Sequence, residues 1–394
     1  MPGPLTGYRI LDLSTVISGP LATMLLADQG ADVVKVESIS APDHARGAGH
    51  GENEFTATFL NNNRNKRGVA LDLKTPSGVE VLKKLAATAD VFIQNFRPGV
   101  VERLGIGEEV IREIRPDIIY VSISGFGEQG PMSHKPVYDP IIQAISGLTT
   151  IQAGSDEERP RLVRTILPDK LTAMTTAQAV SSALAHKEKS GEGQHVRVSM
   201  LDAVVSFLWS SDMGGHTFVG REVDTQRAAT FIDLIYETKT DYISVSAMAN
   251  KQWTALCDAL GHPEWKDDER FKTPALRDLN ANERLNMTQE ALREKPADEW
   301  LEILDAAGVP SAPVLKRRDM INHPQVVASN LIVETEHPVA GKLRQTRPAA
   351  RFSKTPPEIR HGAPRHGEHT DELLAEIGLS GDDVAALRES GAIK

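Results

Sequence analysis

The chain has 394 residues, of which 40% are hydrophobic, and this length and composition exclude a disordered chain and suit two or three domains of roughly 150 residues each. A formal net charge of −10 provides no broad basic surface for nucleic acid or anionic lipid, and no apolar run approaches the roughly 18 residues that span a bilayer. Because the single cysteine, Cys257, cannot form a disulfide within the chain, we expect a cytoplasmic protein with no nucleic-acid or membrane partner.

Short apolar runs alternate with helical patterns over the first 200 residues. Ser18-Gly19-Pro20 opens a helix that Gly30 closes, another helix is expected over 76–89, and a long one runs from about Lys170 to Glu188. Strands separated by helices imply a parallel sheet that is covered on both faces. The expected strands are Tyr8 to Leu13, Val33 to Val36, Val69 to Leu73, Val91 to Gln94, Ile118 to Ile123 and Val196 to Ser199.

The pattern changes near residue 225. Phe231 to Ile235 and Tyr242 to Val245 flank the segment 238–241 like two strands of a hairpin, and helices then dominate to Gly308. We therefore expect an α/β protein with a large domain over 1–224 and 326–394 and a smaller α+β domain over 225–325. Cys257 has apolar neighbours at helical spacing and is expected in the core of the smaller domain.

Two motifs have weak functional interpretations. Gly125, Gly127 and Gly130 fit G-x-G-x-x-G after a strand, but Pro131 and Pro136 follow where a dinucleotide-binding motif needs a helix. His361, His366 and His369 could supply metal ligands, but the segment is more simply a corner before a helix that begins near Thr370. We therefore expect neither a nicotinamide enzyme nor a metal site.

Basic side chains follow two expected strand ends. Arg64, Lys66 and Arg67 precede one strand, and Arg97 and Arg103 follow the next. Loops that leave the strands of an α/β sheet bind ligands, and Arg or Lys there suits phosphate. A solvated charged loop explains these residues equally well from their spacing alone.

Asp169 stands at the start of the expected long helix. A structural helix cap is the simplest interpretation. A helix N-terminus also stabilises a carboxylate, so an aspartate there stays ionised and can attack an activated acyl group.

Taken together, these pieces resemble the class III coenzyme A transferases of the CaiB/BaiF type, which include formyl-CoA transferase, carnitine CoA-transferase and alpha-methylacyl-CoA racemase. The resemblance covers essentially the whole chain. Its markers, in family order, are R-I-L-D-L-S-T-V-I-S-G-P-L-A-T, L-A-D-Q-G-A-D-V-V-K-V-E, N-R-N-K-R-G-V-A-L-D-L-K, N-F-R-P-G-V-V-E-R-L-G, S-G-F-G-E-Q-G-P, S-G-E-G-Q-H-V-R-V-S-M-L-D-A-V and H-G-E-H-T-D-E-L-L.

The resemblance implies a Rossmann-like large domain built from both chain ends, a small domain between them, and two subunits threaded into an interlocked homodimer. It also implies that coenzyme A or an acyl-CoA binds as a substrate over the strand ends and that a carboxylic acid is the acceptor. No permanently bound cofactor is implied.

The family's catalytic aspartate falls on Asp169, which would form a mixed anhydride and then an aspartyl-CoA thioester. Many members carry Arg where this chain has Ser38, with Arg46 as a guessed replacement, and Lys170 directly after the aspartate is unusual. By motif match, the implied coenzyme A contacts are Val16, Leu71, Asn95, Phe96, Arg103 and Leu104, joined by Arg64, Lys66, Arg67, Arg97, Tyr138 and Asp139.

The segment after Pro131 separates transferases from the racemase alternative. Racemases resemble G-H-D there, with a His that exchanges the alpha proton. This chain has Tyr138-Asp139, which fits the transferase pattern, and His134 lies four residues too early. The glycine run of formyl-CoA transferases has no counterpart between Gly220 and Asn250, so formate–oxalate exchange is disfavoured.

Overall fold

The computed structural model describes residues 3–222 and 234–394, which form two compact units. The first unit comprises Met1–Gly147, Val163–Ser211 and Ser329–Lys394, and the second comprises Leu148–Leu162 and Asp212–Ala328. Residues 148–162, which the sequence analysis assigns to the large domain, thus group with the second unit. Each unit has its own hydrophobic core.

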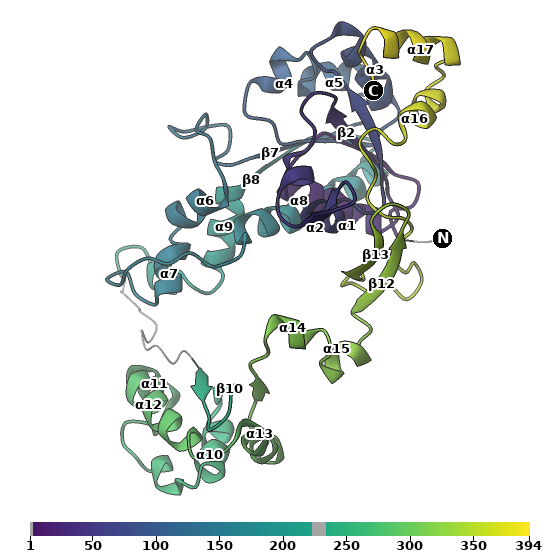
Figure 1. Ribbon diagram of the computed structural model, residues 1–394. Helices are drawn as coiled ribbons and strands as arrows, with labels where there is room; N and C mark the ends of the chain where they lie inside the picture. Colours follow the sequence, from purple (N-terminus) through teal and green to yellow (C-terminus); the bar gives the residue numbers. More distant parts are fainter. Residues whose placement is uncertain (1–2, 223–233) are drawn as a thin grey trace. The chain divides into compact units, whose positions relative to one another are not determined.

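A six-stranded parallel sheet forms the centre of the first unit (Figure 1). Its strands, in spatial order, are β5 (Lys66–Leu71), β2 (Asp32–Ser38), β1 (Arg9–Asp12), β6 (Val91–Gln94), β7 (Ile119–Ser124) and β8 (His195–Ser199). The order reverses between β1 and β6, which creates a crevice at the carboxyl ends of these two strands. The expected parallel sheet is confirmed.

Helices cover both faces of this sheet, so apolar residues of its strands are buried on both faces. On one face, α1 (Ser18–Asp28) and α8 (Leu167–Ser190) pack over Val33 and its neighbours. On the other, α3 (Pro76–Ala87) and α5 (Glu108–Ile114) pack over Val34. Because neighbouring strand residues point to opposite faces, Val33 and Val34 belong to different cores.

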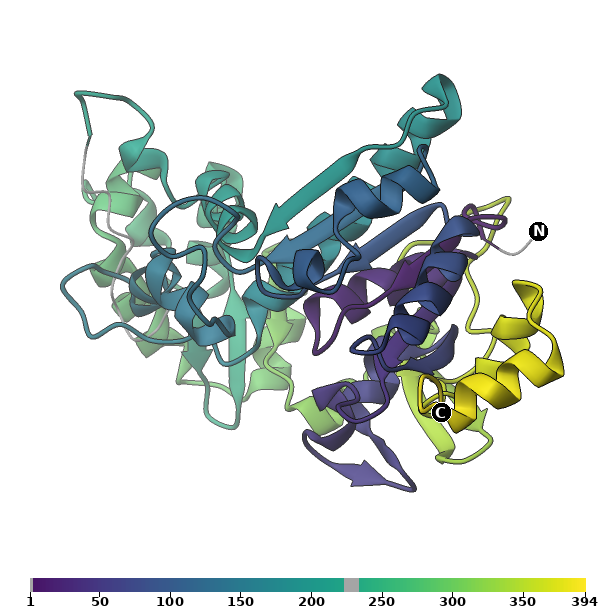
Figure 2. The ribbon, with the colours of Figure 1, turned by 90° about the horizontal axis from the view of Figure 1, so that it is seen from above.

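The carboxyl-terminal segment completes the core around β5. Helices α16 (Thr370–Glu376) and α17 (Gly381–Glu389) contribute Leu373 and Val384 to the core that α3 covers. Leu71 at the end of β5 forms an antiparallel bridge with Ile393. Figure 2 shows the yellow carboxyl-terminal helices beside the purple and blue amino-terminal elements.

Shorter elements surround the sheet. The η1 turn is His44–Gly47, and residues 332–346 form a two-stranded hairpin. The remaining elements of the first unit are β3 (Gly51–Glu52), β4 (Phe55–Thr56), α2 (Ala57–Asn63), α4 (Val100–Arg103), α6 (Asp139–Ile145), α9 (Met200–Trp209), β12 (Ile332–His337) and β13 (Gly341–Thr346).

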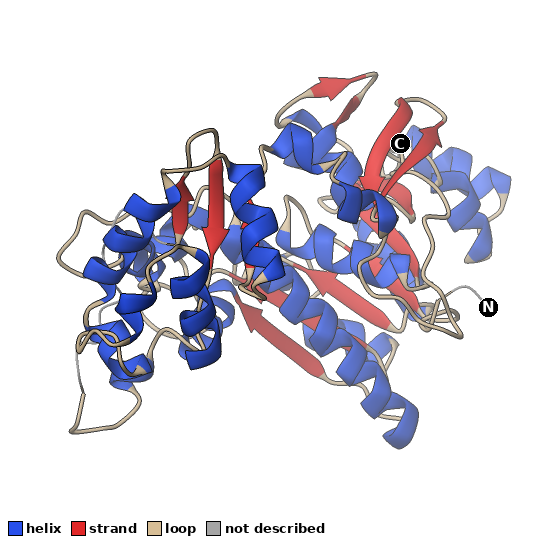
Figure 3. Cartoon of the chain, turned by 90° about the horizontal axis from the view of Figure 1, so that it is seen from below, coloured by secondary structure: helices blue, strands red, loops and turns tan. Residues whose placement is uncertain are grey.

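The second unit combines a three-stranded antiparallel sheet with helices (Figure 3). Tyr242 pairs with Glu237 across the expected turn, whereas residues 231–233 of the expected first strand lie outside the described residues. Its elements are α7 (Leu148–Ala153), η2 (Gly214–His216), β9 (Ile235–Glu237), β10 (Tyr242–Val245), α10 (Asn250–Ala259), η3 (Pro263–Lys266), α11 (Pro274–Leu279), α12 (Ala281–Leu292), α13 (Ala297–Ala306), β11 (Ser311–Pro313), α14 (Arg317–Met320) and α15 (Pro324–Ala328).

Cys257 lies in the core of the second unit, as expected, and burial raises the pKa of its thiol to about 12. The thiol is therefore protonated at neutral pH and unreactive. Within the described ranges, we find no helix of the length and apolarity that crossing a membrane requires.

Candidate active site

The loops that leave β1 and β6 are joined at the point where the strand order reverses. The Asn95 side chain accepts a hydrogen bond from the Thr15 amide at 3.0 Å and donates one to the Thr15 carbonyl at 2.8 Å. One side chain therefore fixes the two loops that border the crevice. Ligands of open parallel sheets bind in such crevices.

A cavity of about 250 Å³ opens beside these loops. It brings Asp169 together with five of the residues that the sequence indicates, namely Val16, Asn95, Phe96, Arg97 and Tyr138. Residues that sequence reasoning missed also line it, among them Ser18, His44, Lys135 and Met200. Ser18 and Met200 lie within two of the family markers, but nothing in those motifs singles out their side chains.

Asp169 lies within the first turn of α8, because the helix begins at Leu167 rather than at Lys170. Pro168 precedes it, and proline is favoured in a first helical turn. Ser18, the first residue of α1, lines the same cavity as Asp169, and its backbone amide and hydroxyl lower the pKa of the Asp169 carboxyl group. Two helix N-termini thus meet at this carboxylate.

The pKa of Asp169 is nevertheless raised, to about 6. Burial is the main cause and the Asp139 carboxylate is the second, and together they outweigh the hydrogen bonds from Ser18. Burial and the Asp139 charge therefore weaken this acid, although the expected ionised form still predominates at neutral pH. At pH 7 the ionised form still exceeds the protonated form by about tenfold, so the carboxylate is available as a nucleophile.

Asp139 begins α6 and faces the same turn. Its Oδ2 accepts a hydrogen bond from the Asp169 amide at 3.3 Å, and its Oδ1 accepts one from Gln143 at 2.7 Å. Burial raises the pKa of Asp139 as well. The predicted residue Asp139 thus acts on Asp169 rather than lining the cavity.

Cationic side chains border the cavity without ion-pair partners. Arg97 and Lys135 both line it, and neither has an acidic partner in the described ranges 3–222 and 234–394. Unpaired cations of this kind suit the phosphates of a nucleotide or a carboxylate. Lys170, the unusual residue after Asp169, instead donates to the Thr165 hydroxyl at 2.8 Å.

A second cleft on the carboxyl edge holds two more of the predicted residues. Arg103 and Leu104 line it together with Lys74 and Lys83, which the sequence analysis missed although Lys74 directly follows an expected strand. The cleft encloses about 470 Å³. Leu71, by contrast, is fully buried in the core beneath this edge, so its side chain lines neither cavity.

The basic cluster ahead of β5 forms ion pairs within the fold. Arg64, Lys66 and Arg67 lie at the amino end of β5, away from the carboxyl edge. Each is held by acids: Arg64 by Asp28 at 2.7 Å, Lys66 by Asp12 at 3.0 Å, and Arg67 by Asp32, Glu372 and Glu376. These ion pairs tie the three cations into the fold, and their expected contact with coenzyme A stays a prediction.

Arg46 is also engaged elsewhere. It forms two hydrogen bonds with Glu37, at 2.8 and 2.6 Å, and its guanidinium lies 3.7 Å from the centre of the Phe59 ring. These contacts occupy its guanidinium, and its guessed role in place of an arginine at position 38 stays a prediction. The Ser38 carbonyl is bonded instead to His366, at 3.0 Å.

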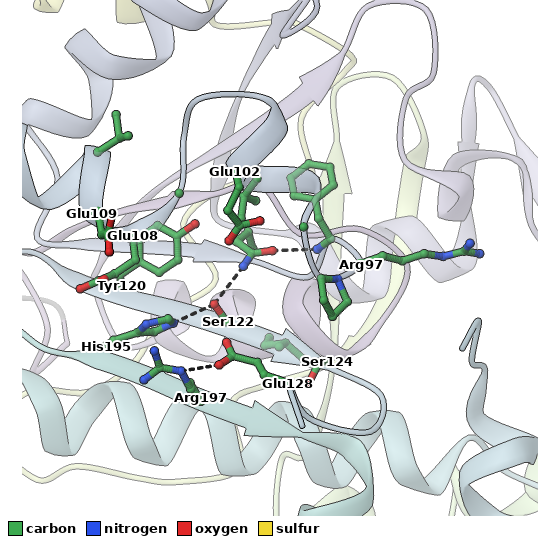
Figure 4. Close-up of a pocket in the computed structure, with 18 residues that line it drawn as sticks. Arg97, Glu102, Glu108, Glu109, Tyr120, Ser122, Ser124, Glu128, His195 and Arg197 are labelled. Carbon is green, nitrogen blue, oxygen red and sulfur yellow. Dashed lines mark hydrogen bonds and ion pairs between the residues drawn. The ribbon is translucent and has the colours of Figure 1, made fainter. Parts of the chain in front are cut away.

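A neighbouring pocket of about 530 Å³ shares Phe96, Arg97 and Pro98 with the Asp169 cavity (Figure 4). Ser122 lies 2.9 Å from His195 and accepts a hydrogen bond from Gln94 at 3.0 Å. Arg97 points away from His195 and Ser122 in Figure 4. Gln94 also accepts the Phe96 amide at 2.8 Å, so this chain of hydrogen bonds supports the loop after β6.

His134, on which the racemase alternative depends, is exposed and does not line the Asp169 cavity. The three histidines near residue 366 do not converge either, since His366 bonds to Ser38 and His369 accepts the Gly68 amide at 3.1 Å. Among the described residues, no group of three or more His, Cys, Asp or Glu side chains is arranged to hold a metal ion.

Comparisons with known proteins agree with this geometry. The family model "CoA-transferase family III" matches residues 5–370. The chain is 36% identical over 392 residues to the human succinyl-CoA:glutarate CoA-transferase, covering 97% of this chain and 87% of that protein. It is 32% identical over 420 residues to the formyl-CoA:oxalate CoA-transferase of Bradyrhizobium diazoefficiens, covering 100% of this chain and 98% of that protein.

Among solved structures, a CAIB/BAIF family protein from Brucella suis superposes with a TM-score of 0.82 at 28% identity. The match covers 96% of this chain and 100% of that one. The fold and the sequence thus identify the same group of proteins over nearly the whole length. This chain belongs to CoA-transferase family III.

Proposed function

We propose that this CoA-transferase moves coenzyme A from an acyl-CoA to a carboxylic acid through covalent intermediates on Asp169. The observation that carries the proposal is the buried Asp169 carboxylate, which lines a cavity at the switch point of the sheet and is bonded by Ser18. A carboxylate in this place can attack an activated acyl group, because most of it is ionised at pH 7.

The reaction proceeds in balanced steps. An Asp169 oxygen attacks the carbonyl carbon of the donor thioester, and the carbon–sulfur bond breaks, which leaves a mixed anhydride and the coenzyme A thiolate. The thiolate then attacks the Asp169 carbonyl carbon and releases the donor acid as a carboxylate. The acceptor carboxylate attacks the resulting aspartyl-CoA thioester, and its carbon–sulfur bond breaks, which gives a second mixed anhydride and the thiolate. The thiolate finally attacks the acceptor's carbonyl carbon, which forms the acceptor's CoA thioester and releases the Asp169 carboxylate. Covalent catalysis thus divides one difficult exchange into easier steps.

Coenzyme A binds along the carboxyl edge of the sheet in this proposal. The cleft with Lys74 and Arg103 suits its phosphates, and the loops that carry Val16 and Asn95 lead to Asp169. Coenzyme A is a substrate here, and no permanently bound cofactor takes part. The Ser18 amide and hydroxyl stabilise negative charge on the Asp169 acyl oxygen when the thiolate attacks.

The acceptor is proposed to be a dicarboxylic acid. The similar proteins are named for succinyl, glutarate and oxalate groups, all of which carry two carboxylates. Lys135 and Arg97, which have no ion-pair partner among the described residues, can bind the carboxylate that does not react.

A homodimer, interlocked as in the family, is also proposed. Helices α6, α8 and α9 pack together and expose apolar side chains that a second subunit would cover. The exposed residues on or beside these helices are Tyr138, Ile141, Ile145, Ile166, Met174, Phe207 and Trp209.

Intact-protein mass spectrometry tests the covalent mechanism. The parent protein is mixed with a panel of acyl-CoA thioesters that includes succinyl-CoA and glutaryl-CoA, beside Asp169→Asn as the matched control. We expect a mass gain of one acyl or one coenzyme A group in the parent alone. An equal adduct on Asp169→Asn, or transfer activity retained by that variant, contradicts the role of Asp169. Uptake of deuterium from heavy water at carbon 2 of a 2-methylacyl-CoA would indicate the racemase alternative.

A further inference from the structure

The loop from Ser14 to Ser18, which joins β1 to α1, contains an unusual backbone conformation. Val16 has a φ of +72°, in the left-handed region that β-branched residues rarely adopt. Such a conformation persists only where the surroundings hold it, and it is found at functional sites. Val16 lines the cavity, and Ser18 two residues later bonds to Asp169.

The Asp43 carboxylate holds Val16 in this conformation through a hydrogen bond. Its Oδ1 accepts hydrogen bonds from the Val16 amide and the Ala45 amide, both at 2.9 Å. Its Oδ2 is paired with the ammonium group of Lys35 at 2.9 Å, and both side chains are fully buried. The carboxylate therefore contacts the loop through one oxygen and a buried cation through the other.

Further buried charged side chains bond to the backbone of the same loop. Lys35 also donates to the Ser14 carbonyl at 3.0 Å, and Asp12 accepts the Ser14 amide at 2.9 Å. Asp12 is paired with Lys66, which donates to the Pro20 carbonyl in the first turn of α1 at 2.9 Å. Two acids and two lysines, all buried, thus bond to the backbone on both sides of Val16.

We propose that Asp43 is a positioning residue: it holds the Val16 peptide in its left-handed conformation and thereby directs Ser18 toward Asp169. Asp43 does not line the Asp169 cavity and bonds to Val16 and Lys35 instead, so it acts through the loop. Lys35, bonded to its other oxygen, holds the carboxylate in place, since an unpaired charge in this position is strongly unfavourable. This inference rests on the proposed role of Asp169.

A double-mutant cycle between Asp43 and Val16 tests the proposal. Glycine adopts a positive φ without steric conflict, so a chain with Val16→Gly no longer needs Asp43 to hold that conformation. We expect Asp43→Ala to lower kcat between about 10-fold and 100-fold in the parent, as small displacements at a reacting group do. In the Val16→Gly background, the same substitution should lower kcat less than about fivefold.

A matched control separates positioning from general stability. Asp28→Asn breaks another buried ion pair of the same unit, with Arg64 at 2.7 Å, far along α1 from the loop. It should lower the melting temperature, as Asp43→Ala does, while kcat stays within about twofold of the parent. Should Asp43→Ala fail to fold, Asp43→Asn, which retains an oxygen acceptor, takes its place in the same cycle.

Two outcomes would overturn the proposal. One is a folded Asp43 variant whose kcat stays within about threefold of the parent. The other is a loss of kcat of equal size in both backgrounds, which is what a merely structural role gives. Asp169→Asn is assayed alongside. If this variant retains transfer, the proposed function fails. If it is inactive, the double-mutant cycle tests the role of Asp43 separately from that function.

Discussion

The Asp169 amide donates a hydrogen bond to the Asp139 carboxylate at 3.3 Å, so two acids share the turn where α6 and α8 begin. Asp139 is bonded to the amide of Asp169 and to Gln143, and its negative charge raises the pKa of the nucleophile. Asp139 therefore holds the backbone of Asp169 and also changes its acidity. The second effect can be measured directly.

Asp139→Asn should move the acid limb of the pH–rate profile to lower pH. The active form of Asp169 is the carboxylate, and its pKa of about 6 means that activity falls as the pH drops through 6. Removal of the Asp139 charge lowers that pKa by roughly one unit. The check is kcat/KM against pH between 4.5 and 8, and an unchanged limb would show that Asp139 does not influence the ionisation of Asp169.

Ser18→Ala should have the opposite effect on the same profile. The variant loses the hydroxyl that lowers the pKa of Asp169, so the acid limb moves to higher pH. Because the hydroxyl also stabilises charge on the acyl oxygen, kcat at the pH optimum should fall by about 10-fold to 100-fold. A limb that moves to lower pH would contradict the assigned hydrogen bond.

Asn95→Ala should separate the two loops of the crevice. Both hydrogen bonds to Thr15 are lost, and the free energy of unfolding should fall by about 1 to 3 kcal/mol. The affinity for coenzyme A should fall as well, since Asn95 lines the cavity. Asn62→Ala, which removes one bond within α2 to Thr58, is the control and should change neither quantity by a comparable amount. Calorimetry and thermal unfolding give both values, and equal effects of the two substitutions would contradict the role of Asn95.

Arg103→Ala and Arg67→Ala form a contrasting pair. Arg103 lines the cleft on the carboxyl edge, so its loss should raise the Kd for coenzyme A by about 10-fold to 100-fold, as for one charged hydrogen bond of about 1.5 to 3 kcal/mol. Arg67 is held by three acids at the other end of β5, and its removal should lower the melting temperature and leave that Kd unchanged. If titration calorimetry showed a higher Kd for Arg67→Ala and an unchanged Kd for Arg103→Ala, the basic cluster would be part of the binding site.

The alternation of apolar strands and amphipathic helices predicts most of the first unit correctly. Runs such as Val91 to Gln94 are buried on both faces, and the sequence shows this directly as a lack of polar residues. The strand expected from Val69 begins earlier, at Lys66, because Lys66 and Arg67 lie in ion pairs that no local pattern reveals.

The candidate site is less accessible to sequence reasoning. Asp169 is found through a family motif, and its own surroundings suggest only a helix cap. The distinction between a cation that binds a ligand and one that stabilises the fold depends on acids far away in the sequence, such as Asp28 for Arg64. The bond from Ser18 to Asp169 and the hold of Asp43 on Val16 likewise join segments that only the folded sheet brings together.

The bridge between Leu71 and Ile393 sets an order for folding during synthesis. The outer side of β5 lacks its covering side chains, Leu373 and Leu374 among them, until these residues have left the ribosome. Contacts over so long a separation form slowly. The second unit lies within that interval, so it can fold while the nascent sheet still exposes apolar surface, and this exposure to aggregation lasts until Leu373 and Leu374 have been synthesised.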